Sequence, residues 1–386
     1  MSGLADLRAA ARVRVAALPA PSSALEDWRY VRTAVLAQPA PAGNSIPSWS
    51  PAIPGPYLHV RDGQAQSGGT PWPEAWRLDL PDAATVARLQ DGLASRTDAV
   101  ACWPLAEAAC VQHLRVTGDA GVPLTIIDEA VSGVAAWHLE IDIAANAALD
   151  VHLVHQASGS ARALPSLAMR LGAGARVRVF QIQRGATAQL LSRWTATLDR
   201  DAKLEATLRG FGGVLVRHQI EVRLAAPGAE ADLAALLTAD GDEQVHLHTR
   251  VHHDASQTVS RQLVKTLLDG RSAASFDGCV AMAVGVHGGD AGMQNRNLLL
   301  SPTARADTRP QLDIRADDVK AAHGATVGRL DDDELLYLRL RGLDVQTASA
   351  LLTTGYIAEV EQRLHNIIIK SRTTPIMLTF CYGPVW

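Results

Sequence analysis

Four histidines lie close together in the sequence and form its densest group of side chains that could do chemistry. His246, His248 and His252 share the parity of one strand face, and His253 follows them directly. Neutral imidazole is a good ligand for zinc and for iron, so this group could form a metal site. Alternate polar residues are also what the solvated face of a strand carries, so the same spacing fits a group without a chemical role.

Two kinds of enzyme are alternatives, one that uses these histidines and one that uses carboxylates. The H-x-H-x3-H spacing from His246 to His252 is similar to that of a metal-binding cupin strand, although no carboxylate follows at the spacing that a cupin needs. A carbohydrate-active enzyme would need an acid/base pair of carboxylates on one face of its fold. The sequence has no G-x-x-x-x-G-K-[ST] motif for nucleotide phosphates and no G-x-S-x-G turn for a serine nucleophile. We therefore do not expect the chain to hydrolyse ATP.

Composition and charge restrict the remaining possibilities. The 386 residues carry 36 Lys and Arg against 40 Asp and Glu, a formal net charge of −4, so no overall positive field attracts nucleic acid or an anionic membrane. No apolar run is long enough to span a membrane, and arginines interrupt the N-terminal stretch where a signal peptide is apolar. The 4 cysteines include no C-x-x-C pair, as is usual for reduced thiols. We expect a cytoplasmic protein that binds neither nucleic acid nor membrane.

Residues 1–100 suggest a small α-rich domain. A capping box at 23–26 predicts a helix that runs from there through Leu36. Prolines, glycines and serines then crowd residues 39–73, which predicts a loop. A further helical segment, broken near its end by a proline, is expected over 83–109.

Residues 101–330 change to the two-residue period of strands. Short turns with a central alanine recur at Ala148, Ala175, Ala202 and Ala229, each 27 residues after the last. A fixed period of this size is typical of a solenoid, in which each coil buries its apolar side against the next. The repeats lack the leucine-rich repeat motif and are strand-like throughout. The sequence therefore predicts a mainly β protein built on a β-solenoid.

Residues 331–386 return to a helical pattern. Three aspartates at 331–333 precede an apolar run, as acidic residues do at the start of a helix, and Gly342 follows as a stop. A second helix with an apolar stripe is expected over 344–370. The predicted order is therefore helices, β-solenoid, helices.

Several motifs, most of them in the second half of the chain, resemble one known family. Residues 317–328 (DDVKAAHGATVG) and 336–342 (LYLRLRG) resemble the signature of the SufD family, scaffold subunits of the SUF iron–sulphur cluster assembly machine. The resemblance is dense from about residue 245 to 365 and thin before it. The other segments similar to this family are QNRNLLLS at 294–301, RPQLDI at 309–314, Phe276 with Gly278, and EDWRY at 26–30.

The resemblance implies a fold and a set of partners. Members of the family have an N-terminal helical domain, a right-handed parallel β-helix and a C-terminal helical domain. The resemblance also implies pairing with a SufB-like scaffold through the β-helix, docking of the ABC ATPase SufC on the C-terminal helices, and a possible homodimer when the chain is alone. On this basis we expect a non-catalytic scaffold without a cofactor of its own. The residues expected at the ATPase dock are Tyr337, Leu338, Arg341, Gly342, Leu351 and Leu352.

His323 is the residue that the resemblance brings closest to a cluster. It lies in the family-like segment at the end of the expected solenoid, and some family members have a cysteine where this chain has Ala321. Neutral imidazole can bind iron, so a transient iron–sulphur cluster at the interface with SufB could take one ligand from His323. The alternative is a strand histidine that is hydrogen-bonded to backbone beside Gly324.

Overall fold

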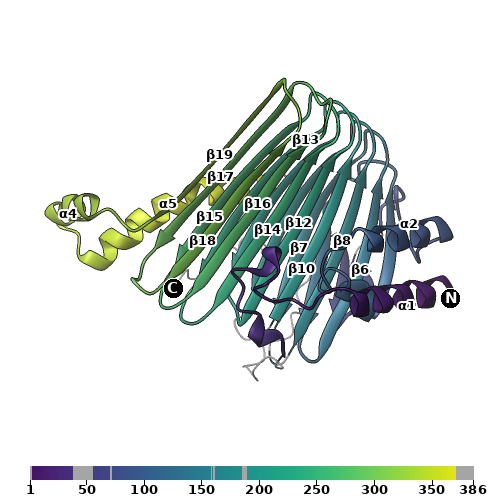
Figure 1. Ribbon diagram of the computed structural model, residues 1–386, viewed down its shortest axis with the longest axis horizontal. Helices are drawn as coiled ribbons and strands as arrows, with labels where there is room; N and C mark the ends of the chain where they lie inside the picture. Colours follow the sequence, from purple (N-terminus) through teal and green to yellow (C-terminus); the bar gives the residue numbers. More distant parts are fainter. Residues whose placement is uncertain are drawn as a thin grey trace.

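The computed structural model describes residues 2–37, 55–69, 72–157, 159, 161–184 and 189–370, except the side chains of Ser2 and of 365–370. Its centre is a parallel β-solenoid of two long sheets, with the first helices at one end and the last two helices at the other (Figure 1). The prediction of a mainly β protein with a parallel β-solenoid is therefore confirmed.

The elements follow the order helices, strands, helices, with three short strands among the first helices. The helices are α1 Ser2–Ala17, α2 Ala83–Ala94, α3 Trp103–Glu107, α4 Asp332–Leu340 and α5 Val345–Lys370, and the 3-10 turns are η1 Glu26–Trp28 and η2 Thr33–Ala37. The first strands are β1 Pro56–Arg61, β2 Gln64–Gly69, β3 Trp76–Asp79, β4 Cys110–Val116, β5 Leu124–Ala130, β6 Val134–Ile143, β7 Ala148–Ala157, β8 Arg162–Leu171, β9 Arg176–Arg184 and β10 Gln189–Leu198. The others are β11 Lys203–Phe211, β12 Leu215–Leu224, β13 Glu230–Ala239, β14 Gln244–His253, β15 Val259–Leu268, β16 Ala273–Met282, β17 Gly289–Leu299, β18 Arg305–Ile314 and β19 Val319–Gly328.

Each coil of the solenoid contributes one strand to each sheet. The ten-stranded sheet runs β19-β17-β15-β13-β11-β9-β7-β5-β1-β2, and the nine-stranded sheet runs β18-β16-β14-β12-β10-β8-β6-β4-β3. Successive side chains of a strand point to opposite faces, so alternate residues such as Leu233 and Ala235 fill the core between the sheets. The core contains mostly Ala, Val and Leu, which explains how a chain with 4% aromatic residues fills it.

The alanines of the repeat lie at one corner of the solenoid. The strand register places Ala175, Ala202 and Ala229 one above the other, fully buried, and each amide donates to the carbonyl three residues before it. In the preceding coil the corner residue is Ala147, whereas Ala148 begins β7 one position further on. The prediction for Ala148 was wrong because that coil has one residue more than a constant period assumes.

Two N-terminal predictions were also wrong. The capping box at 23–26 does not start an α-helix: Leu25 precedes the short turn η1, without a side-chain cap, and η2 follows. Residues 56–69 of the predicted loop form the antiparallel hairpin β1–β2, whose first strand pairs with β5 because Leu58 and Val60 alternate into the core. Residues 38–54 and 70–71 of that loop lie outside the described residues.

Residues 25–37, here called the N-terminal strap, lie across the outer face of the nine-stranded sheet (Figure 1). Trp28, Val31 and Leu36 are buried against outward-facing apolar side chains of β6, β8, β10 and β12. The backbone of the strap is tied down as well, because Arg162 donates to the Leu36 carbonyl at 2.6 Å and Gln189 to the Val35 carbonyl at 2.7 Å. The tertiary contacts of the strap therefore stabilise this conformation more than its sequence pattern favours an α-helix.

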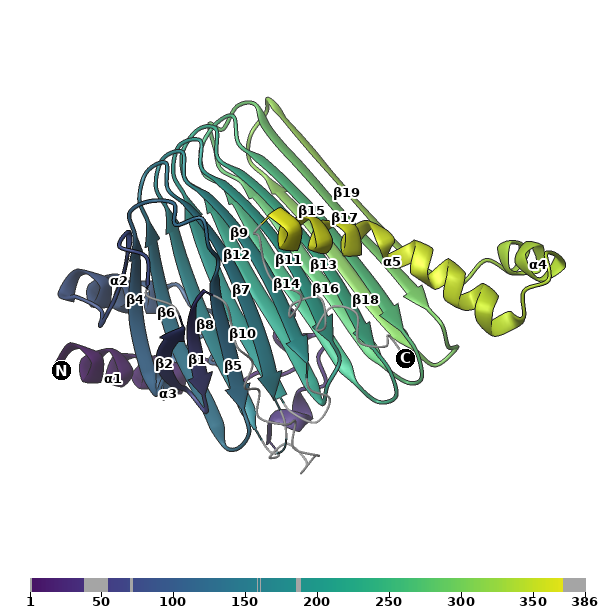
Figure 2. The same cartoon turned by 180° about the vertical axis from the view of Figure 1, so that it is seen from behind.

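The C-terminal helices begin and end as the sequence predicts. Asp331 caps α4 by accepting bonds from the amides of Asp333 and Glu334, and Gly342 follows the helix with a φ of 96°. The second part of α5 lies on the outer face of the ten-stranded sheet, where Ile357 and Val360 pack on outward-facing leucines (Figure 2). No helix in the described part of the chain is long and apolar enough to cross a membrane.

Candidate functional site

The last strand of each sheet leaves one end of the solenoid open. Within the described residues, β18 and β19 each pair with a neighbour on one side only. Their side chains are mostly half-buried or exposed, whereas those of β16 are mostly buried. Leu312, Ile314, Val319 and Ala321 cover the end of the core and are themselves only partly buried. We call β18 and β19 the open edge. The opposite end differs, because short antiparallel strands form its edges and α1 to α3 pack beside it on the outward-facing Val111 of β4.

His323 lies in the middle of the open edge, on β19. It pairs in register with Met293 of β17, whose side chain is buried in the core. Residues in register on parallel strands face the same way, so His323 is directed toward the space between the two sheets. It is nevertheless exposed, because no coil among the described residues stacks on β19. Together with Asn295 and Thr326 it lines an open hollow along this edge. Its role as a ligand stays a prediction.

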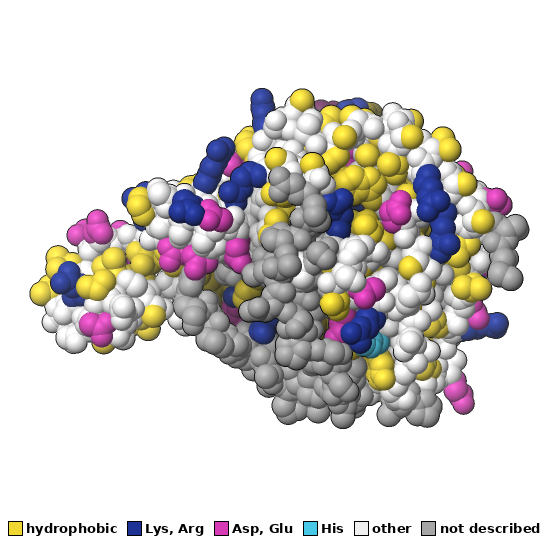
Figure 3. Space-filling model, turned by 90° about the horizontal axis from the view of Figure 1, so that it is seen from below, with side chains coloured by type: hydrophobic (Ala, Val, Ile, Leu, Met, Phe, Trp, Pro, Cys, Tyr) yellow, Lys and Arg dark blue, Asp and Glu magenta, His cyan; other side chains and the backbone are white. Residues whose placement is uncertain are grey.

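The residues predicted for an ATPase dock gather on a helical arm, which we define as residues 332–352. Tyr337 is 56% exposed and Leu351 53%, whereas Leu338 and Leu352 are half-buried. The Arg341 guanidinium lies 5.1 Å from the centre of the Tyr337 ring. The arm extends beyond the last strand, and apolar side chains stand among charged ones at its tip (Figure 3). The large apolar residues exposed on it are Leu336, Tyr337, Leu340, Val345 and Leu351.

The histidine group at 246–253 is neither a solvated face nor a shared metal site. His246, His248 and His253 are buried, and His253 points into the core while the other two point outward. The ring of His246 bonds to Ser275 at 2.7 Å and Gln244 at 3.0 Å, and that of His253 bonds to Thr258 and Ser260, both at 2.8 Å. Burial lowers the pKa of His246 to about 3 and that of His253 to about 4, so both are neutral. The geometry gives no support to a cupin-like centre.

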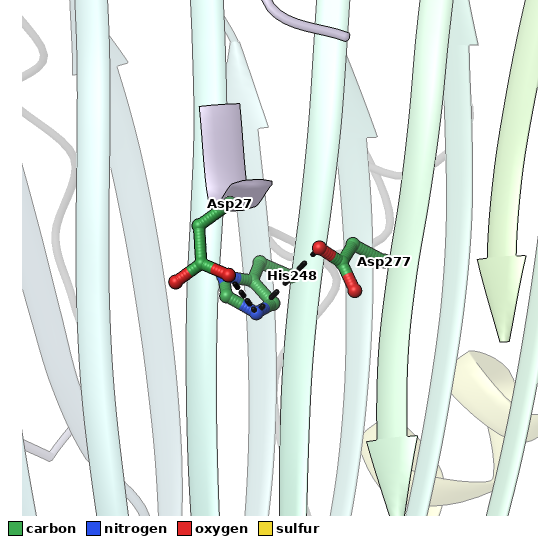
Figure 4. A group of neighbouring side chains, drawn as sticks. All are labelled: Asp27, His248 and Asp277. Carbon is green, nitrogen blue, oxygen red and sulfur yellow. Dashed lines mark ion pairs between the residues drawn. The ribbon is translucent and has the colours of Figure 1, made fainter. Parts of the chain in front are cut away.

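One member of that group belongs to a different cluster. His248 on β14 lies between Asp27 of the strap and Asp277 of β16, with its Nε2 atom 3.9 Å from a carboxylate oxygen of each (Figure 4). Burial, and after it the neighbouring Arg217, holds the pKa of His248 well below its usual value. Three potential metal ligands of suitable type therefore meet under the strap.

The bonds around these three side chains identify an ion-pair cluster and not a metal centre. Arg217 donates to His248 Nδ1 at 2.9 Å, so the ring proton is on Nε2, where a metal would have to bind. The oxygens that face His248 are already bonded to guanidinium groups: Asp27 Oδ1 to Arg250 at 2.9 Å, and Asp277 Oδ2 to Arg309. The cluster thus ties strap to sheet. The sequence analysis missed it because its members come from distant segments that only the coil register aligns.

Comparison with known proteins identifies the relatives of this chain. Residues 109–356 match the family model described as "SUF system FeS cluster assembly, SufBD core domain". The iron–sulphur cluster assembly protein SufD of Escherichia coli is 35% identical over 162 residues, which cover 42% of this chain and 38% of that protein. Protein ABCI7 of Arabidopsis thaliana chloroplasts is 30% identical over 210 residues, 54% of this chain and 44% of that protein.

A mycobacterial relative is matched over a longer stretch. The SufBD family protein ML0594 of Mycobacterium leprae is 32% identical over 254 residues, which cover 62% of this chain and 64% of that protein. The chain thus spans less than two thirds of the length of each of these three relatives. The matched core begins one residue before β4 and ends within α5, so it contains the whole open edge.

Proposed function

Because this chain belongs to the SufBD core family of the SUF iron–sulphur cluster assembly system, we propose that it is a non-catalytic scaffold subunit that pairs with a SufB-like scaffold. The observation that supports this most is the open edge, which lies inside the matched core. Unpaired strand edges are templates for a further strand, and apolar residues left at the end of a core favour a partner that covers them. Leu312 and Val319 are such residues here.

The cluster is cargo in this proposal, and the chain has no cofactor of its own. It would be held transiently between the two scaffolds, with His323 as one ligand. The direction of His323, toward the space between the sheets at the open edge, supports this role, as does the ability of imidazole to bind iron. Ala321, two residues before it on the same face of β19, offers no thiolate.

The helical arm is the part of the chain that we assign to a SufC-like ATPase. Exposed apolar side chains on a projecting pair of helices favour a protein partner, because exposing apolar surface to water costs free energy and a partner that covers it removes that cost. Leu340 is 78% exposed and Tyr337 is beside it in the helix surface, so they would contact the ATPase first. The arm continues into the part of α5 that lies on the ten-stranded sheet, which gives a mechanical connection between dock and solenoid.

Reconstitution with defined partners tests the pairing and the ligand role together. The chain is co-expressed with a SufB-like scaffold and a SufC-like ATPase from the same cell, and the purified complex is loaded with iron and sulphide. We expect a stable complex, and we expect His323→Ala to retain it while cluster assembly falls at least tenfold. His287→Ala is the matched control, because His287 is exposed in a loop outside the open edge. Normal cluster assembly by His323→Ala would remove the ligand role, and dissociation would assign His323 to the interface instead.

The dock is tested by single charges on the arm. Leu340→Asp places a carboxylate in the middle of the exposed apolar surface and should abolish binding of the ATPase in a pull-down, since a buried unpaired charge is costly. Val284→Asp changes an equally exposed apolar residue in the loop after β16 and should bind normally. Equal binding by both variants would place the dock elsewhere.

A further inference from the structure

Three segments that resemble the SufD family and have no assigned role meet at one point of the structure. They are the EDWRY segment at 26–30, the strand around Asp277, and the RPQLDI segment at 309–314. The side chains that join them are Glu26 and Asp27 of the strap, Asp277 of β16 and Arg309 of β18. The strap therefore shares one set of ion pairs with two strands that lie more than 200 residues later in the sequence.

Arg309 is the centre of this contact. Its Nη1 atom donates to Glu26, its Nη2 atom donates to Asp277, and Nη2 also lies 3.7 Å from Asp27 Oδ1. The Arg309 side chain is 13% exposed and that of Asp277 8%, so their contact is shielded from water, whereas Glu26 closes the cluster on the solvent side with 73% exposure. Arg309 is on β18, the last strand of the nine-stranded sheet. One guanidinium thus connects the open edge both to the preceding coil and to the strap.

The strap is itself held firmly on the nine-stranded sheet. Trp28 is fully buried and packs beneath the Arg217 guanidinium, which lies 4.3 Å from the ring centre. The amide of Arg32 donates to the side chain of Gln244 on β14, at 3.1 Å. Asp27 is held by Arg250, also on β14, at 2.9 Å. The Asp27 carboxylate and the strap backbone on either side of it are therefore fixed relative to the middle of the sheet, and Glu26 reaches Arg309 from this fixed backbone.

Strand β18 needs such support more than the inner strands of its sheet do. It has a hydrogen-bonded neighbour on one side only, and most of its residues are only half-buried. Strands of this kind open locally at a low cost in free energy. When a partner then adds a strand, part of its binding free energy is used to order the edge. A contact from elsewhere in the chain that orders β18 before binding would raise the affinity for the partner strand without contacting the partner.

We propose that Glu26 and Asp27 form a clamp that holds β18, through Arg309, in the conformation to which a partner scaffold adds. They are positioning residues, since they act through Arg309 on the edge. The identity of the partner rests on the proposed function, but the clamp itself is a property of this chain alone. The EDWRY segment thereby links the N-terminal strap to the strand at the far end of the solenoid.

The test uses the full chain with both carboxylates neutralised, Glu26→Gln with Asp27→Asn. We expect hydrogen exchange of the β18 amides to become at least tenfold faster, while the amides of β10 in the middle of the same sheet keep their wild-type rates. The control is Glu230→Gln, which removes the exposed ion pair with Lys203 on the other sheet. Unchanged exchange in β18 overturns the clamp, and so does an equal acceleration in β10, which would indicate general destabilisation.

Binding to the SufB-like scaffold supplies the second measurement. The dissociation constant of the double variant should rise at least tenfold, and that of the control should not change. Arg309→Lys should reproduce both effects, because one ammonium group cannot replace a planar fork that reaches two carboxylates from separate nitrogens. If the wild-type chain does not bind that scaffold at all, the proposed function fails, and the exchange rates of β18 still decide whether the clamp exists. If wild type and all variants bind equally well, the clamp alone is wrong.

Discussion

The two sheets of the solenoid are covered on their outer faces by opposite ends of the chain. The N-terminal strap lies flat on the nine-stranded sheet and is held by a buried tryptophan, by backbone bonds and by a cluster of ion pairs. Helix α5 lies on the ten-stranded sheet with its second part only, and its first part continues into the exposed arm. One covering segment is fixed throughout, whereas the other is fixed at one end and free at the other.

This difference assigns different mechanical roles to the two covers. A segment anchored along its whole length adds stability and keeps strands in place. A helix anchored at one end transmits a force applied to its free end, since an α-helix is stiff over a few turns. The anchor of α5 is specific: Lys265 on β15 donates to the Tyr356 carbonyl at 2.7 Å and pairs with Glu359 at 2.9 Å. Four predictions test whether the two faces differ in this way.

The largest expected effect is that of acid on the buried histidines. In the folded chain burial lowers the pKa of each of these imidazoles well below the 6.5 expected when unfolded, so the unfolded chain takes up protons first. Their stabilising contribution is complete above pH 6.5 and is lost as the pH falls toward 4. At about 1.4 kcal/mol per group and pH unit, four of them cost up to roughly 8 kcal/mol between pH 6.5 and 5. They are His152, His218, His246 and His253.

Urea unfolding at neutral pH and near pH 5 measures this loss. The outer face under the strap carries His246 and His248, whereas His152 is the corresponding buried histidine of the ten-stranded sheet. Acid should therefore loosen the strap before it loosens α5, and hydrogen exchange at low pH would show this order. His246→Gln should reduce the pH dependence by one group's share. A free energy of unfolding that is the same at both pH values would contradict the neutral, buried state of these rings.

The next effect is the loss of the anchor of the strap. Trp28→Ala should lower the free energy of unfolding by about 3 to 5 kcal/mol, since it leaves a large cavity under Arg217. Thermal or urea unfolding measures this change directly. A loss below 1 kcal/mol would mean that the strap is a loose cover and that the two faces do not differ as described.

A smaller effect is expected at the anchor of α5. Lys265→Met keeps the aliphatic stem and removes the buried ammonium group, which leaves the Tyr356 carbonyl and Glu359 without this donor, at a cost of about 1 to 3 kcal/mol. Limited proteolysis should then cut within α5 sooner than in the wild type. Lys203→Met removes an exposed ion pair and should cost at most about 1 kcal/mol. Equal proteolysis of both variants would mean that Lys265 is not the anchor.

The smallest effect on stability belongs to the free arm. Tyr337→Ala removes a ring that is 56% exposed, so the free energy of unfolding should change by less than about 0.5 kcal/mol. The contrast with Trp28→Ala, an aromatic truncation on the other cover, is the sharpest measure of the difference between the two faces. A large loss of stability would show that the arm is packed in solution and not free.

Local sequence patterns were sufficient for the solenoid and for the C-terminal helices. The corner alanines and the alternation of the strands repeat within a single coil, and the Asp331 cap and the Gly342 stop are read from adjacent residues. Such signals need no knowledge of distant contacts. The one-residue error at Ala148 arose because corners absorb length differences that leave the strands unchanged.

Features that depend on the coil register could not be predicted from the sequence. Lys265 has the sequence context of a solvated strand charge, and only the position of α5 makes it a buried anchor. The helix predicted from the capping box at 23–26 does not form, because the strap instead makes the ion pairs of Asp27 and buries Trp28. The partners of these two residues lie on β6 to β18. His323 was found through its family-like segment, but its direction toward the core follows only from its pairing with Met293.

The open edge also limits the kinds of assembly that this chain can build. In the part of the chain that the structure describes, long unpaired strands are at one end, and the other end finishes in short antiparallel strands beside helices. Head-to-tail addition, which produces filaments, would need matching edges at both ends. Growth should therefore stop once two edges have met. We expect the cell to match the synthesis of this chain to that of its partner, because a surplus copy has only another surplus edge to bind.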